Sequence, residues 1–113
     1  MASETSIPLA TALAWADLLG YAAHGIASRV LHKTAGGNAT LFAFEEGQSL
    51  SEHVSPFDAL VVVLEGVMTL TIGGKAIRAP AATVTRMPAG VPHALEADER
   101  TRMLLVMLRE PEA

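Results

Sequence analysis

Two histidines, His53 and His93, are the side chains in this sequence best suited to form a binding or catalytic site. They lie about forty residues apart, and each sits in a segment with motif-like spacing of glycine and proline. Gly47 and Gly66 flank the first histidine, and Gly90 closely precedes the second. An imidazole titrates near neutral pH, so it can move a proton, orient an anionic ligand or bind a divalent metal.

Length and composition limit the elements that can hold these histidines. The chain has 113 residues, which is enough for one domain with a core and too few for two. Half of the residues are hydrophobic and 18% are charged, which argues against disorder. The net charge is −4 and the basic residues are scattered, so we expect no nucleic-acid partner. No apolar run approaches the roughly 20 residues of a membrane helix, so we expect no membrane partner.

The cysteine count and the N-terminus bear on chemistry and location. There is no cysteine, which excludes disulfides, thiolate metal sites and cysteine nucleophiles. Residues 7–14 are apolar, but Glu4 stands where a signal peptide carries basic residues, and the run is short. We therefore predict a cytoplasmic protein.

Short β-like runs separated by turn signals dominate after Gly25, whereas residues 10–19 fit one short helix. Gly73-Gly74 suits a tight hairpin turn. About eight strands with turns every 8–12 residues indicate an all-β sandwich or barrel. The expected strands cover residues 28–33, 40–44, 60–64, 67–72, 75–78, 83–87 and 103–108.

Two of these runs, 59–64 and 103–108, are apolar on both faces. Because an antiparallel sheet normally keeps one face polar, the outer face of this sheet must also be covered. A second copy of the chain, packed through a two-fold interface, is the favoured cover and predicts a homodimer. The alternative is that the N-terminal segment shields one of the strands.

The spacing of these motifs resembles that of small single-domain cupins, whose fold is a double-stranded β-helix related to jelly rolls. The first cupin motif is matched at Gly47, His53 and Gly66, and the second at Pro88, Gly90 and His93. The resemblance covers roughly residues 40–108 and implies a barrel over residues 26–113, preceded by an N-terminal segment over residues 1–25.

The sequence also departs from the cupin pattern. The resemblance implies a divalent metal, Fe, Mn, Ni or Zn, held by three histidines and a glutamate. Ser55 stands at the second histidine and Ala59 at the glutamate, while Ala82 and Ala97 replace the second motif's opening glycine and its asparagine. Only His53 and His93 remain from the ligand set, so any metal would be held loosely.

Strand alternation predicts which neighbours share the cavity with the histidines. Glu52 and Glu96 lie at odd offsets and should face away, while Pro56 leaves Asp58 undetermined. Phe57 is a candidate for the cavity mouth. The predicted cavity residues are His53, Ser55, Phe57, Ala59, His93 and Leu95. The alternative is that the two histidines are satisfied core residues.

Three functions are consistent with these residues. The favoured one is the binding of a small organic molecule in an apolar cavity around His53 and His93. The second is a metal-dependent enzyme of the dioxygenase or isomerase type with a reduced ligand set. The third is a structural or interaction module. The sequence identifies no catalytic residue and no particular ligand, because one fold supports many chemistries.

Overall fold

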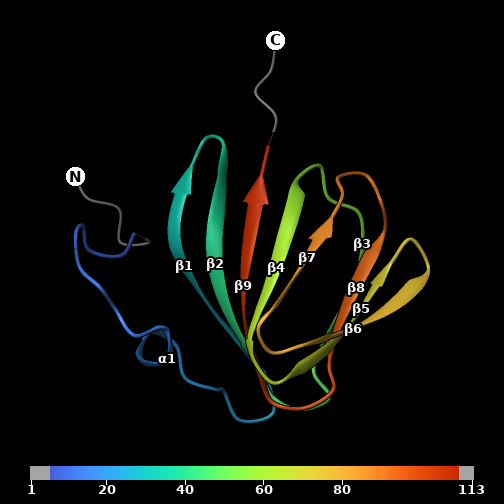
Figure 1. Ribbon diagram of the computed structural model, residues 1–113, viewed down its shortest axis with the longest axis horizontal. Coiled ribbons are helices and arrows are strands. Elements are labelled where there is room, and N and C mark those ends of the chain that lie inside the picture. The colour runs from blue at the N-terminus through green and yellow to red at the C-terminus, as the bar shows by residue number, and fades with distance from the viewer. Residues whose placement is uncertain (1–5, 110–113) are drawn as a thin grey trace.

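The structure, a computed structural model, describes residues 6–109 as nine strands and one short helix (Figure 1). All strand pairs are antiparallel. The elements are α1 (Trp15–Leu18), β1 (Ile26–Thr34), β2 (Gly37–Phe44), β3 (Ser49–His53), β4 (Asp58–Glu65), β5 (Val67–Ile72), β6 (Lys75–Pro80), β7 (Thr83–Met87), β8 (His93–Ala97) and β9 (Thr101–Leu108).

The strands form two sheets that face each other, in the orders β1-β2-β9-β4-β7 and β3-β8-β5-β6. The sheets converge at one end, the lower end in Figure 1, and diverge at the other, which we call the open end. The core lies between them and is fully buried around Phe44, Met68, Leu70 and Met103. This arrangement confirms the predicted all-β jelly-roll barrel.

Most predicted strands are observed, and β5 and β7 have the predicted bounds. The Gly73-Gly74 hairpin joins β5 to β6 with φ angles of 57° and 84°, as expected for a tight turn. The 10–19 segment contains the predicted short helix, which is four residues long. No helix in residues 6–109 has the length and apolar character needed to cross a membrane.

The outer face of the five-stranded sheet is covered in part by the N-terminal segment. Leu41 and Ala43 of β2 are almost fully buried, yet they lie outside the central core cluster. Their neighbours in the sheet, Arg29 and Arg102, donate hydrogen bonds to the carbonyl oxygens of Leu18 and Leu19, at 3.1 and 2.9 Å. The N-terminal segment, the alternative cover predicted for residues 59–64 or 103–108, thus lies over β2 instead.

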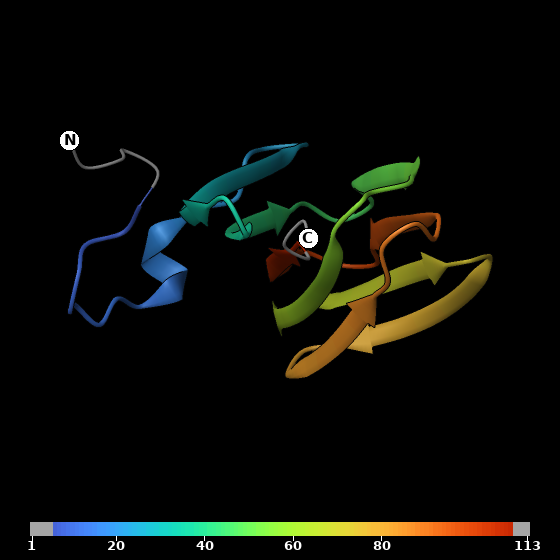
Figure 2. The same ribbon diagram turned by 90° about the horizontal axis from the view of Figure 1, so that it is seen from above.

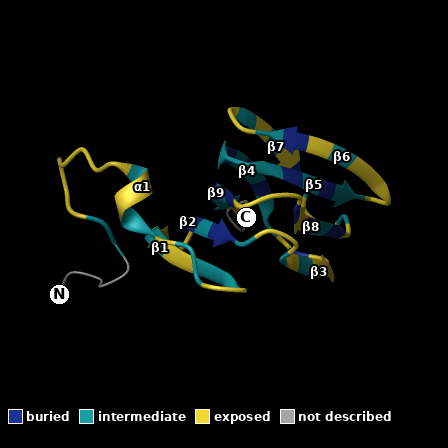
Figure 3. Cartoon of the chain, turned by 90° about the horizontal axis from the view of Figure 1, so that it is seen from below, coloured by how far each residue is buried: buried dark blue, intermediate teal, exposed yellow. Residues whose placement is uncertain are grey.

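The described part of the N-terminal segment does not cover the outer face of β4 and β7. On β4, Leu60, Val62 and Leu64 are only partly buried, and their cross-strand neighbour Val84 of β7 is 63% exposed. Figure 3 shows that residues of the five-stranded sheet differ in burial, and that the residues around α1, outside the sheet, are largely exposed. The cover predicted over residues 59–64 and 103–108 therefore stays a prediction.

Gly66 closes the narrow end of the barrel between β4 and β5. Its φ is +87°, a value that favours glycine, and a Cβ there would overlap the carbonyl oxygen of Arg100 and the hydroxyl of Thr101. That hydroxyl is buried and bonds the backbone of Val67, accepting from its N–H at 3.1 Å. The glycine is therefore needed both for its backbone conformation and for the space it leaves.

We predict that Gly66→Ala destabilises the fold by about 3 kcal/mol or more, because backbone strain adds to overlap with the backbone of β9. Gly74→Ala is a matched control, since its φ is +84° but a Cβ there would meet no atom within 4 Å. Its cost should be only the left-handed strain, about 1 kcal/mol. Urea denaturation measures both variants, and equal losses of stability would contradict the steric account.

Candidate ligand site

His53 and His93 meet across a pair of neighbouring strands at the open end. His53 is the last residue of β3, His93 is the first residue of β8, and the two are direct partners in the register. Residues directly opposite one another on antiparallel strands point to the same face. The ring centroids are accordingly 4.4 Å apart, with an interplanar angle of 72°. His93 is 4% exposed, whereas His53 is exposed at the rim.

Hydrogen bonds between two loops hold the strand ends that carry these histidines. The N–H of Gly90, in the loop before β8, donates to the carbonyl oxygen of Ser55 at 2.9 Å. In the same loop, the N–H of Ala89 donates to Asp58 Oδ1 at 2.9 Å. The hydroxyl of Ser55 accepts the N–H of Phe57 at 3.1 Å and so tightens the loop after β3. The two motifs are therefore joined directly through their loops.

Each imidazole has one nitrogen committed to the backbone. His53 Nδ1 lies 3.0 Å from the carbonyl oxygen of Ser51, and His93 Nδ1 lies 3.3 Å from that of Val91. A carbonyl oxygen can only accept, so Nδ1 must carry the proton in both rings. In a neutral ring, Nε2 then carries a lone pair. Within residues 6–109, neither Nε2 has a hydrogen-bond partner.

Burial keeps the more enclosed ring neutral. Desolvation lowers the pKa of His93 below its ordinary value of 6.5, and the nearby His53 lowers it further. The hydrogen bond to Val91 acts in the opposite direction. At neutral pH, His93 is therefore a neutral hydrogen-bond acceptor at Nε2.

The two rings line a cavity of about 160 Å³ between the sheets at the open end. Apart from the histidines and Ser55, every side chain of the lining is apolar. The open-end cavity is lined by Phe42, Leu50, His53, Ser55, Ala59, Met87, His93, Leu95, Leu105 and Met107. Five of the six residues predicted for the cavity from the sequence are in this lining.

The sixth residue, Phe57, is not among the lining residues. The guanidinium of Arg109 lies over its ring instead, with Cζ 5.2 Å from the centroid of the Phe57 ring. Of the acidic side chains weighed as replacement ligands, Glu52 and Glu96 are exposed. Asp58 is engaged with Ala89 and with Arg86, whose guanidinium is 3.6 Å away. None of these carboxylates belongs to the lining of the open-end cavity.

Several lining residues were not predicted from the sequence. Met87 and Met107 both contribute to the lining, where their flexible side chains suit an irregular apolar surface. Leu50 lies three residues from His53, an odd offset that simple alternation places on the other face. A register shift between Leu50 and His53 reverses the alternation and turns Leu50 toward the cavity. Strand parity alone could not reveal that bulge.

The residues present do not fit a four-ligand metal site. In residues 6–109, no three histidine, cysteine or acidic side chains are grouped so that they could hold a metal ion. Ala59 offers no donor atom, and the hydroxyl of Ser55 is already engaged by Phe57. Two imidazole nitrogens are all that remains of the expected set. We therefore derive no chemical step from a metal.

Comparisons with known proteins place the chain in a family. Residues 40–108 match the family model described as a cupin domain. A conserved protein of unknown function from Streptococcus pyogenes has a similar crystal structure, with 34% sequence identity, a TM-score of 0.89, and coverage of 100% of this chain and 98% of that one. A cupin superfamily protein from Desulfitobacterium hafniense is 27% identical, with a TM-score of 0.85 over 93% of this chain and 96% of its own. A search of proteins with curated function gives no match.

One substitution in the second motif supports the alignment of that motif. Ala82 stands where the cupin pattern has its opening glycine, and its φ is +67°, a left-handed value that is uncommon for alanine. The backbone thus keeps the conformation of the glycine position although the residue has changed. Together with the matched model, the two facing sheets and the paired histidines, this shows that the chain belongs to the cupin family.

Proposed function

We propose that this protein binds a small, largely apolar organic molecule in the open-end cavity, with His53 and His93 accepting hydrogen bonds from it. The observation that carries the proposal is the pairing of two free Nε2 acceptors with a lining that is apolar apart from Ser55. Binding pockets commonly combine apolar walls with a few polar groups that fix orientation. The buried imidazole of His93 and the imidazole of His53 at the rim are such polar groups, because neither Nε2 has a partner within residues 6–109.

The size of the cavity limits the ligand. Its volume of about 160 Å³ is close to that of an apolar protein cavity of roughly 150 Å³ that accommodates benzene. The ligand, or the part of it that enters, is therefore the size of one six-membered ring. Because a neutral Nε2 accepts, the group facing the histidines is a hydroxyl or N–H donor. A ring-sized phenol or enol has both properties.

We predict that phenol binds at least as tightly as toluene, a ligand of the same size that lacks the donor. In the double variant His53→Phe/His93→Phe, the ratio of phenol to toluene affinity should fall by about fivefold or more, because a buried hydroxyl without an acceptor costs about 1–3 kcal/mol. NMR titration of backbone amides measures both affinities. His24→Asn, which removes an exposed imidazole outside the cavity, should leave the ratio unchanged.

The same titration separates the alternatives. Affinity that is unchanged after dialysis against a chelator supports a site that needs no metal. Phenol binding that is lost with the chelator and restored by a divalent metal would favour the metal-dependent enzyme. If neither ligand shifts any resonance of the cavity lining, the ligand-binding proposal is wrong and the structural module gains support.

The lowered pKa of His93 has a consequence for stability. Below about pH 6.5, His93 takes up a proton in the unfolded chain, whereas burial resists this protonation in the folded chain. The contribution of His93 to the free energy of unfolding is therefore complete above about pH 6.5 and is lost as the pH falls. We predict that His93→Phe flattens the pH dependence of the unfolding free energy between pH 6.5 and 5, by up to about 1.4 kcal/mol per pH unit. Denaturant titrations at several pH values test this, and parallel curves for the two proteins would refute it.

We also propose that the protein is a homodimer formed through the outer face of the five-stranded sheet. The face carries apolar side chains that stay partly or largely exposed in one chain, among them Leu60, Val62, Val84, Val106 and Leu108. Monomeric proteins rarely leave such a contiguous face uncovered. A cytoplasmic location and the lack of a nucleic-acid partner stay predictions from the sequence.

The dimer proposal predicts a light-scattering mass of twice 11.8 kDa for the native protein. Val84→Asp should yield the mass of one chain, because it would bury an unpaired charge in the proposed interface. Val54→Asp is the matched control, since Val54 is similarly exposed, at 59% against 63%, but lies in the loop after β3. A monomeric native protein would disprove the dimer.

A further inference from the structure

The segment before β1 forms a loop that is held at both ends and projects between them (Figures 1 and 2). At its start, the N–H of Ile7 donates to the carbonyl oxygen of Leu31 at 2.8 Å, and the Ser6 hydroxyl lies 2.9 Å from His32 Nδ1. We call residues 8–14 the N-terminal loop. All seven of its residues are exposed, and Leu9 and Leu13 are 93% and 38% exposed.

The second anchor of the N-terminal loop is an arginine on the outer face of β9. The guanidinium of Arg102 lies over the rings of Trp15 and Tyr21, at 5.7 and 4.5 Å from their centroids. It also pairs with Glu65 at 2.9 Å, and the Tyr21 hydroxyl donates to the same carboxylate. These contacts fix the position of the loop, so its exposure is a property of the folded chain.

An exposed loop of this composition is costly for a single chain. No charged residue occurs between Ser6 and Ala16, which leaves two leucines in water without a charged neighbour in the segment. Ala10 has a φ of +51°, a left-handed conformation that costs an alanine free energy.

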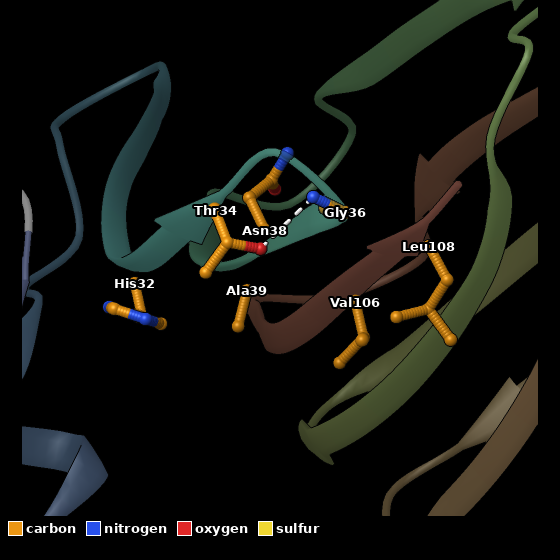
Figure 4. Close-up of a pocket in the computed structure, with 8 residues that line it drawn as sticks. His32, Thr34, Gly36, Asn38, Ala39, Val106 and Leu108 are labelled. Atoms are coloured by element: carbon orange, nitrogen blue, oxygen red, sulfur yellow. Dashed lines mark hydrogen bonds between the residues drawn. The ribbon is translucent and has the colours of Figure 1, made fainter. Parts of the chain in front are cut away.

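The outer face of the five-stranded sheet offers a matching surface in the same chain. A groove there is bordered by His32, Thr34, Gly36, Gly37, Asn38, Ala39, Val106 and Leu108. Figure 4 shows His32, Ala39, Val106 and Leu108 projecting on one side of β1, β2 and β9. Leu108 is 51% exposed, and no acidic or lysine side chain borders the groove. Interface centres are likewise poor in charge.

We propose that in the homodimer the N-terminal loop of each chain packs on the partner chain, where Leu9 and Leu13 are buried against the outer face of the partner's five-stranded sheet. The occupant is a second copy because each chain carries both the projecting loop and the apolar face. A two-fold interface therefore satisfies both features twice. The anchored loop loses little freedom on binding, which lowers the cost of association. The similarity to the Streptococcus pyogenes protein extends over the whole chain, this loop included.

This inference rests on the proposed dimer and adds the loop to its interface. Sedimentation equilibrium should show that the double variant Leu9→Ser/Leu13→Ser raises the dimer dissociation constant about a hundredfold, since each leucine loses a buried position. The double variant Thr11→Ser/Ala12→Ser changes the same loop without removing a leucine. Its dissociation constant should stay within a few-fold of that of the native protein.

Isotope-filtered NOE spectra of dimers mixed from labelled and unlabelled chains locate the leucines directly. NOEs between the Leu9 or Leu13 methyl groups and the partner's outer-face valines and leucines support the proposal. Such NOEs only within one chain, or a dimer that Val84→Asp dissociates and the leucine variant does not, overturn the loop's role and leave the dimer intact. A monomeric native protein overturns both, whereas the phenol titration tests the cavity independently.

Discussion

The register between β3 and β8 determines what the open end of this barrel can do. It places His53 directly opposite His93, so that their imidazoles meet on the inner face of the smaller sheet. A shift of one residue would turn one ring outward, because side chains alternate along a strand. The bulge in β3 and the hydrogen bonds between the two adjoining loops fix this register. The open-end cavity therefore depends on this register.

The shape of the barrel explains where the open-end cavity forms. Where the sheets converge, Gly66 lets the β4–β5 turn lie tightly against β9, and large buried side chains such as Phe44 and Met68 pack between the sheets. Where they diverge, small residues replace two metal ligands of the cupin pattern. Ala59 and Ser55 occupy less volume than the glutamate and histidine of that pattern and carry no charge. The loss of ligands therefore leaves an apolar chamber with two acceptors.

The sequence predicts the parts of this fold whose residues are strongly patterned. The apolar runs at β4 and β9 and the Gly73-Gly74 turn give strands and a hairpin where they are observed. The strands that carry the histidines, β3 and β8, were not among the expected runs. The residues of β3 are mostly exposed and include serine and glutamate, so β3 lacks an apolar pattern. The pairing of β3 with β8 depends on contacts between residues that are distant in sequence.

Motif spacing and parity identified half of the residues that line the cavity, and their failure at Leu50 has a physical cause. The bulge that turns this side chain inward leaves no mark in the sequence. The doubly apolar strands predict a cover over the outer face, and over β4 this stays a prediction. They could not show that the N-terminal segment covers β2 while leaving β4 open, since that depends on where Arg102 anchors the segment.

The most direct test of the proposed site is the ¹⁵N NMR spectrum of the histidine side chains at neutral pH. We predict that His53 and His93 both carry their proton on Nδ1, and that the Nε2 resonance of at least one of them moves much further on addition of phenol than on addition of toluene. Protonated Nε2 atoms, or Nε2 resonances that phenol leaves unchanged, would contradict the account.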